Sequence, residues 1–425
     1  IEDNIVSCVR AWFGLNNSSN RAFMFSPRSQ GGLGLLRPRV MYYAKKLSFF
    51  LDLLNSDDEQ TKHTARSSLA LHMTKRKCQP AIRLEENSFA GFKTDQTGRL
   101  MKDSKVTWRR SQWVHLNELC MRAGVSLHLF GDEYLLKMRT DDDIVIQFRD
   151  GKSFYLCYKR QEIEKTVDKW KELESQGRVA RTQSINHSLS VSSLTNMHLS
   201  DSVVQFIFKA RLQLLMCNSL LHVYYPNVSR HCSRCGFFTE TVSHILNGCP
   251  HNKSAIQKRH NRIANIVSKA VSAEFPQSTI LCDQIVKPTH FLQDSDQFEA
   301  VPHTRPDMCV ISNEQRECLI VEVAVPFDVF MDDSYQAKFD KYLPLCQRIS
   351  DIGFNCRIIV LIVGSTGSVH KKFVSGLCMA GLTPARARAI AKYCSISAAI
   401  GSKIIWKQRC KHTLSASLRP TAMHV

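Results

Sequence analysis

The sequence predicts a multidomain protein with helices in its N-terminal part and connector, a small cysteine–histidine module, and a C-terminal α/β domain. In that last domain we expect a mixed sheet flanked by helices. Apolar residues recur at helical spacing through residues 1–75. A cysteine–histidine cluster follows at residues 232–249, and from about residue 279 short apolar runs alternate with helical patterns. The chain has 425 residues, 44% of them hydrophobic, which is enough for more than one core.

Four parts of the chain follow from these patterns. They are a helical N-terminal part (1–75), a connector (76–200), a helix with the cysteine–histidine module and a basic helix (201–275), and the α/β domain with C-terminal helices (276–425). The opening Ile1-Glu2-Asp3-Asn4 lacks the basic and apolar regions of a secretory signal. We therefore expect a longer protein to continue in front of it.

The N-terminal part and the connector are predicted to be mainly helical. A turn at Gly31-Gly32-Leu33-Gly34 precedes a long helix that includes residues 41–54. Residues 162–176 alternate in charge around apolar positions, which predicts an amphipathic helix that Gly177 can end. Residues 184–200 contain six serines among seventeen residues and predict a flexible linker.

One acidic segment of the connector resembles the turn that carries the paired aspartates of a polymerase. Asp141, Asp142 and Asp143 lie between the apolar runs of residues 134–146. An acidic hairpin turn accounts for the same residues without catalysis. We therefore predict a hairpin here and no polymerase site.

The charge of the chain favours nucleic acid as a partner. Fifty-seven Lys and Arg against 38 Asp and Glu give a net charge of +19, and such an excess attracts polyanions. A basic protein without this specialisation is the alternative. The longest apolar runs fall far short of the roughly 20 residues of a membrane span, so we expect no membrane role. Sixteen cysteines in a long chain without a signal peptide indicate reduced thiols and local metal binding.

Four potential metal ligands follow the pattern C-x2-C-x8-H-x4-C: Cys232, Cys235, His244 and Cys249. Zinc prefers four tetrahedral ligands drawn from thiolate sulfur and imidazole nitrogen, and two close cysteines form a knuckle that a later His and Cys can close. Gly236 lets the chain bend after the second cysteine. The pattern predicts one structural zinc, with His231 and His251 as substitute ligands close by. The alternative is a chance cluster in a cysteine-rich chain.

A basic helix is predicted directly after this cluster, from Lys253 to about Ala273. Its cations nearest the cluster are Lys253, Lys258, Arg259 and Arg262. A rigid knuckle beside a basic helix suits contact with a phosphate backbone, so we predict that these four residues bind nucleic acid. The alternative is a solvated helix face without a ligand.

Two strands are predicted at residues 305–312 and 318–325, joined by a short turn at 313–317. The second strand has one carboxylate, Glu322, among seven apolar residues, which is the pattern of a strand buried on both faces. A buried carboxylate is costly unless it is paired, protonated or bound to metal. The turn is too short for a crossover helix, so the two strands must pair antiparallel.

A hairpin centred between Glu314 and Gln315 puts Asp307 opposite Glu322, with Cβ atoms about 5 Å apart on one sheet face. Two facing carboxylates are protein ligands that magnesium prefers.

The following helix, residues 333–348, is expected to pack on the sheet through three apolar positions, Phe339, Leu343 and Cys346. Lys338 and Lys341 are neighbours on this helix, and either one could assist at a phosphate. The alternative for the carboxylate is a Glu322–Arg305 salt bridge with both lysines in solvent.

In chain order, these features resemble the C-terminal part of the polyprotein of site-specific non-LTR retrotransposons with a restriction-like endonuclease, of the kind that inserts into ribosomal RNA genes. Trp12 and the Gly31–Gly34 turn resemble the thumb after a reverse-transcriptase palm. The cysteine–histidine cluster resembles the CCHC zinc knuckle region, together with Asn247-Gly248-Cys249 and Arg259-His260-Asn261. The matches to the PD-(D/E)xK core are Pro306-Asp307, Val321-Glu322-Val323 and Lys338-Phe339-Asp340-Lys341-Tyr342.

The resemblance implies a nuclear protein whose endonuclease nicks target DNA, so that the freed 3′ hydroxyl primes copying of the element RNA. It implies that Asp307 and Glu322 bind the catalytic magnesium and that Lys338 or Lys341 assists. Because the palm is absent, reverse transcription is expected only of the full-length polyprotein. Ala324 stands where the pattern has a lysine two residues after the glutamate, so a lysine of the next helix has to replace it. The alternative function is a catalytically inactive relic that binds nucleic acid.

Overall fold

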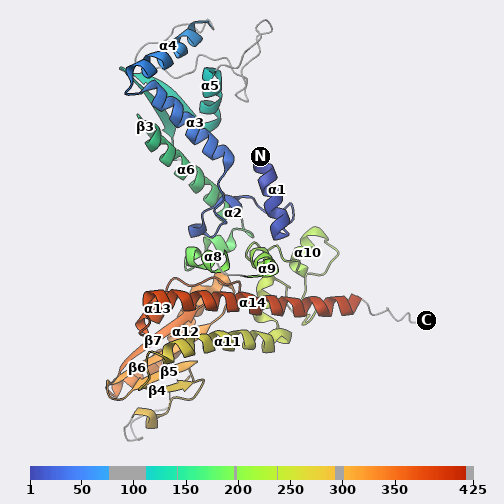
Figure 1. The fold of residues 1–425 in the computed structure, drawn as a ribbon. Coiled ribbons are helices and arrows are strands. Elements are labelled where there is room, and N and C mark those ends of the chain that lie inside the picture. Colours follow the sequence, from blue (N-terminus) through green and yellow to red (C-terminus); the bar gives the residue numbers. More distant parts are fainter. Residues whose placement is uncertain (76–111, 141, 196–198, 237, 292–300, 418–425) are drawn as a thin grey trace, which may run out of the picture. The chain divides into compact units, whose positions relative to one another are not determined.

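The structure, a computed structural model, describes residues 1–75, 112–140, 142–195, 199–236, 238–291 and 301–417. It divides into two compact units, Ile1–Ile5 with Leu35–Thr166, and Val6–Gly34 with Val167–Val425 (Figure 1). Each unit combines helices with a small sheet, so a mixture of helix and sheet is confirmed for the chain. The sheet of the first unit lies at residues 125–148 of the connector, so the prediction of a mainly helical connector is wrong there, because its apolar runs pair with one another as strands. None of the helices in the described ranges has the length and apolar composition that a membrane span requires.

The first unit packs helices against a three-stranded antiparallel sheet in the order β1-β2-β3. Its elements are α3 (Pro38–Leu54), α4 (Glu59–Lys75), α5 (Gln112–Ala123), β1 (Val125–Phe130), β2 (Glu133–Arg139), β3 (Val145–Phe148) and most of α6 (Gly151–Lys171). The predicted long helix is α3, and it follows a turn in which Gly31 and Gly34 have positive φ. The predicted acidic hairpin is also confirmed: β2 pairs antiparallel with β3, and Asp143 in the turn bonds Arg139. Residues 76–111 of the predicted connector lie outside the described ranges.

The second unit contains most of the helices and a four-stranded sheet. Its helices are most of α1 (Glu2–Phe13), α2 (Ala22–Phe25), η1 (Arg28–Gln30), α7 (Arg178–Arg181), α8 (His187–Thr195), α9 (Asp201–Arg211), α10 (Asn218–Tyr224), η2 (His244–Gly248), η3 (Pro250–Asn252), α11 (Lys253–Ser272), η4 (Pro288–Phe291), η6 (Asp328–Phe330), α12 (Met331–Asp351), α13 (Phe373–Met379) and α14 (Pro384–Ser417). Its strands are β4 (Thr279–Cys282), β5 (Met308–Ser312), β6 (Glu317–Ala324) and β7 (Asn355–Ile362). The predicted basic helix is α11.

The four-stranded sheet has the order β4-β5-β6-β7. β5 pairs antiparallel with both β4 and β6, whereas β6 and β7 are parallel and are joined through α12. Met308 lies opposite Val321 and Ser312 opposite Glu317, which is the predicted register. The antiparallel pairing of these two strands and the mixed sheet are therefore confirmed.

Both faces of this sheet are covered, because alternate residues of a strand point to opposite sides. Met308, Val310, Leu319, Val321 and Val323 face a core shared with α11, α13 and α14. Cys309, Ile311, Cys318 and Ile320 face a second core with α12. Figure 1 shows α11 and α14, which contact each other, running along the first of these faces.

The face of α12 that packs on the sheet agrees only in part with the predicted one. Phe339 and Cys346 pack, as predicted, against clusters that include sheet residues, but they and Leu343 are only partly buried. Tyr342, Leu345 and Ile349 are buried instead. Tyr342 had not been counted as apolar, although its ring is buried while its hydroxyl bonds the Arg305 carbonyl.

The predicted flexible linker at residues 184–200 is wrong for its described part. Residues 187–195 form α8, and Ser190 and Ser193 are fully buried. Their hydroxyls donate to the carbonyls of Asn186 and Leu189 one turn earlier, and Ser190 also accepts the Val369 amide at 2.9 Å. Serines that satisfy their hydroxyls in this way can lie in a core, so the serine content did not indicate flexibility.

A buried carboxylate holds the turn that follows β7. Asp328 is fully buried and accepts hydrogen bonds from Thr366 N at 2.9 Å, Thr366 Oγ1 at 2.7 Å and Ser368 N at 3.2 Å. Arg211, also buried, bonds the same threonine. Gly364 is required beside this carboxylate, because a Cβ there would lie 2.4 Å from Asp328 Oδ1. The turn therefore depends on Asp328.

We predict that Asp328→Ala lowers the free energy of unfolding by about 3 kcal/mol, because it leaves the turn amides buried without their acceptor and the buried Arg211 without the negative charge near it. Urea denaturation followed by circular dichroism measures the change. Asp351→Ala, at the exposed end of α12, is the control and should change the stability by less than about 0.5 kcal/mol. Equal effects of the two substitutions would contradict the role of Asp328.

Candidate metal centre and carboxylate site

The structure brings the four predicted zinc ligands together. The ligand atoms of Cys232, Cys235, His244 and Cys249 all lie within 4.8 Å of one another. Cys232 Sγ is 4.0 Å from Cys249 Sγ, and Cys235 Sγ is 3.4 Å from His244 Nε2. Tetrahedral zinc with bonds of about 2.3 Å to sulfur and 2.0 Å to nitrogen separates its ligands by about 3.5–3.8 Å. The cluster can therefore bind zinc, and the flanking His231 and His251 are not part of it.

Backbone hydrogen bonds shape the knuckle. Cys232 N donates to Phe238 O and Gly236 N donates to Cys232 O, both at 2.8 Å, and Gly236 has the positive φ expected at this bend. His244 starts η2, the short helix that leads to Cys249. The local chain thus directs all four side chains to one point.

A buried ion pair attaches the knuckle to α14. Glu240 is fully buried, accepts Ser233 N of the knuckle at 3.3 Å, and pairs with Arg409 at 2.6 Å. Burial by itself would raise the pKa of Glu240, but the hydrogen bond and charge of Arg409 outweigh it, so the pKa is lowered. Glu240 is therefore ionised and fixes the loop between Cys232 and Cys235.

Helix α11 begins four residues after Cys249 and exposes three of the four predicted nucleic-acid contacts, Lys253, Lys258 and Arg262. The fourth prediction, Arg259, is wrong. Its side chain is 3% exposed and donates to Ser402 Oγ at 2.7 Å and to Val325 O at 3.3 Å. Arg259 lies on the apolar stripe of the helix, so it supports the packing of α11 on α14 and does not face a ligand.

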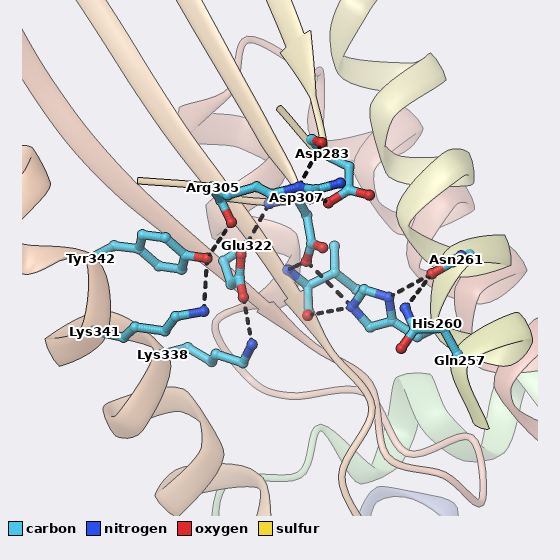
Figure 2. A network of polar contacts seen from close by, with 11 residues as sticks. Gln257, His260, Asn261, Asp283, Arg305, Asp307, Glu322, Lys338, Lys341 and Tyr342 are labelled. Carbon is cyan, nitrogen blue, oxygen red and sulfur yellow. Dashed lines mark hydrogen bonds and ion pairs between the residues drawn. The ribbon is translucent and has the colours of Figure 1, made fainter. Parts of the chain in front are cut away.

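The two predicted carboxylates meet at the end of the β5–β6 ladder (Figure 2). Glu322 is 2% exposed, although it lies in a strand with buried apolar neighbours. Its Oε2 accepts the Asp307 amide at 3.1 Å, and Asp307 Oδ2 accepts the Val323 amide at 2.8 Å. Glu322 is therefore fixed to the backbone of Asp307, and Asp307 is fixed to the backbone of Val323, the residue after Glu322.

Lys338 is the lysine that reaches these carboxylates. Its Nζ lies 2.5 Å from Glu322 Oε1. Lys341 Nζ instead bonds the Tyr342 hydroxyl at 3.0 Å. The alternative Glu322–Arg305 pair does not form, since Arg305 bonds Asp283 at the surface.

His260, which the sequence pattern placed only with the knuckle region, completes the cluster. His260 of α11 lies with Nε2 3.0 Å from Val323 O and 3.4 Å from Asp307 Oδ2 (Figure 2). The spacing along the helix could have indicated its position. His260 precedes the buried Ile263 and Val267 by three and seven residues, so it lies on the same face of the helix. A polar residue on a buried helix face is the clue that was available.

The electrostatics of the cluster follow from these contacts. The hydrogen bond to Asp307 raises the pKa of His260 to about 9, although burial opposes the shift. Burial by itself would raise the pKa of Asp307, but the hydrogen bond and charge of His260 outweigh it and the pKa is lowered. Burial, together with the charge of Glu322, raises the pKa of Tyr342. At neutral pH an ionised Asp307 therefore faces a protonated His260.

The residue types of this cluster fit magnesium, since two carboxylates offer the hard oxygen ligands that this ion prefers. Both carboxylates are held by protein donors. Among the described residues, the knuckle is the group of three or more His, Cys, Asp or Glu side chains with metal-ligand spacing. The assignment of magnesium to Asp307 and Glu322 is therefore a proposal, whereas the knuckle has the geometry of a zinc site.

We predict that the purified chain contains one zinc per molecule and that Cys232→Ser combined with Cys249→Ser abolishes it, because two ligands do not close a tetrahedral site. Elemental analysis by mass spectrometry measures the zinc. Cys282→Ser, an exposed thiol away from the knuckle, is the control and should keep the metal. Absence of zinc from the parent protein, or equal zinc in all three proteins, would contradict the site.

No protein-family model matches this sequence, and no curated protein matches it.

Proposed function

We propose that this chain is the C-terminal part of a retrotransposon polyprotein and acts as a metal-dependent endonuclease that nicks DNA. The strongest support is the environment of Glu322, a carboxylate inside a strand buried on both faces. A buried ion pair seldom stabilises a fold more than apolar residues of the same volume. Its juxtaposition with Asp307 and Lys338 is therefore better explained by chemistry than by stability.

The reaction is hydrolysis of a phosphodiester. Water attacks the phosphorus and the bond to the 3′ oxygen breaks, which leaves a 3′ hydroxyl and a 5′ phosphate. A divalent cation held by Asp307 and Glu322 would polarise the phosphodiester and assist the attacking water. Lys338, whose side chain is 31% exposed, can reach from Glu322 to a bound phosphate and stabilise the negative charge that grows on it.

Lys338 can also replace the lysine that the PD-(D/E)xK pattern has at the position of Ala324. The PD-(D/E)xK pattern has a lysine two residues after the glutamate, and here that position is a buried alanine at the end of β6. Lys338 of α12 brings its ammonium to the same carboxylate from the neighbouring helix. The contact favours an active nuclease over a relic that only binds nucleic acid.

Nucleic-acid binding is assigned to the knuckle and to the exposed cations of α11. Lys253, Lys258 and Arg262 follow the knuckle as exposed residues of one helix, which suits contact with phosphates. By resemblance, the partners are target DNA and element RNA in the nucleus, and the freed 3′ hydroxyl primes reverse transcription by the full-length polyprotein.

We predict that Asp307→Ala and Glu322→Ala each reduce nicking of a labelled duplex in magnesium by about 100-fold or more, since several kcal/mol of metal assistance are lost. Lys338→Ala should reduce nicking by about 100-fold. Lys341→Ala should have a smaller effect, because its ammonium contacts Tyr342 and not the carboxylates. Gel electrophoresis of the products measures nicking, and a separate shift assay measures DNA binding.

The control for these substitutions is Asp351→Ala on the exposed end of α12, which should nick like the parent. EDTA should stop the parent reaction. Nicking by both carboxylate variants at the rate of the parent would refute the site, and a parent that binds DNA but never nicks it would identify the relic.

We predict that replacing Lys253, Lys258 and Arg262 together by alanine weakens nucleic-acid binding and reduces the slope of log affinity against log salt by about 1 per lost phosphate contact. Fluorescence anisotropy at several salt concentrations measures both. Asn265→Ala, exposed on the same helix, is the control. An unchanged slope in the triple variant would place the phosphate contacts elsewhere.

A further inference from the structure

We propose that His260 is a positioning residue of the carboxylate site: it holds Asp307 and the Val323 carbonyl in place and thereby makes the helix after the knuckle part of the catalytic centre. The inference rests on the proposed nuclease function. It adds a residue that lies 47 positions before Asp307 in the sequence and on a different element.

The geometry gives His260 two acceptors at once. Its Nε2 lies 3.0 Å from Val323 O and 3.4 Å from Asp307 Oδ2, while Val323 N donates to that same oxygen of Asp307 at 2.8 Å. The imidazole therefore bridges Asp307, which lies beside Glu322 in the neighbouring chain segment, and Val323, which follows Glu322 in the sequence. Without it, the Val323 amide is the remaining described donor to this oxygen.

The imidazole is itself oriented. Its Nδ1 lies 3.3 Å from Asn261 Oδ1, and Gln257 Nε2 donates to the same oxygen at 2.7 Å (Figure 2). Asn261 thus fixes the ring from the side opposite Asp307. A hydrogen bond on each ring nitrogen is the arrangement that sets the direction of an imidazole.

The helix that carries His260 is anchored at two points before this residue. At its start, Asn252 donates to Ile245 O at 2.8 Å and accepts Arg234 Nη1 from the knuckle loop. One residue before His260, the buried Arg259 bonds Ser402 of α14 and Val325 O just beyond β6. These contacts fix the position of the helix along the sheet, so the His260 side chain is held next to Asp307.

The consequence for catalysis follows from the role of Asp307. A carboxylate that binds metal must be held within about 0.5 Å of its productive position, and loss of a group that orients such a ligand typically costs about 10–100-fold in metal affinity or activity. We therefore expect His260 to affect metal binding and turnover, with little effect on DNA affinity, which depends on the exposed cations of α11.

The experiment uses the full chain with His260→Ala, His260→Gln and the control Asn265→Ala. Binding of manganese as a probe ion is measured by electron paramagnetic resonance, and nicking is measured as kcat and KM. We expect His260→Ala to weaken manganese binding and to lower kcat by about 10–100-fold each, with KM unchanged. His260→Gln, which keeps an N–H donor, should recover most of both values, and Asn265→Ala should match the parent. Thermal unfolding of each variant reports whether it is folded.

The outcomes separate this inference from the proposed function. If the parent binds manganese and nicks DNA but His260→Ala does the same, the positioning role is refuted and the nuclease stands. If His260→Gln, folded like the parent, is as defective as His260→Ala, donation of a hydrogen bond is not its role and the inference also fails. If the parent neither binds manganese nor nicks, the proposed function fails and the inference with it.

Discussion

Glu322 imposes the constraint on which the polar organisation of the second unit depends. Its strand is buried on both faces, and an ionised carboxylate there is unstable unless nearby groups offset the lost hydration. Groups that do so include the Lys338 ammonium from α12 and the Asp307 amide just before β5. One side chain, Glu322, therefore contacts both α12 and the residue that precedes β5. It links the position of α12 to the register of the β5–β6 hairpin.

The same solution recurs at two other buried carboxylates of this unit. Asp328 joins η6 to the turn after β7, and Glu240 joins the knuckle to α14 through Arg409. In each case the partners are distant in sequence, so each carboxylate fixes how two elements pack. Removing one partner would leave a buried charge without compensation, which is more costly than losing an apolar contact.

Helix α11 links the knuckle to the carboxylate site. Asn252, directly before the helix, is bonded to the knuckle loop. The buried face of the helix packs on the sheet, and its exposed residues include cations suited to phosphates. Because these features share one rigid helix, a nucleic acid bound along the cations would be held in a defined relation to His260 and Asp307. If the proposed function holds, this arrangement would couple nucleic-acid binding to catalysis without a moving part.

The sequence by itself determined the features that depend on residues close together in the chain. These are the ligand spacing of the knuckle, the basic helix, and the hairpin that places Asp307 beside Glu322. A short turn allows few registers, so that pairing could be derived. Tertiary packing decided the rest. It buried Arg259, turned Tyr342 of α12 to the sheet, made residues 187–195 a packed helix, and brought His260 to Asp307. These outcomes depend on contacts between elements far apart in the chain, and composition and periodicity carry no information about which distant group will satisfy a given polar atom.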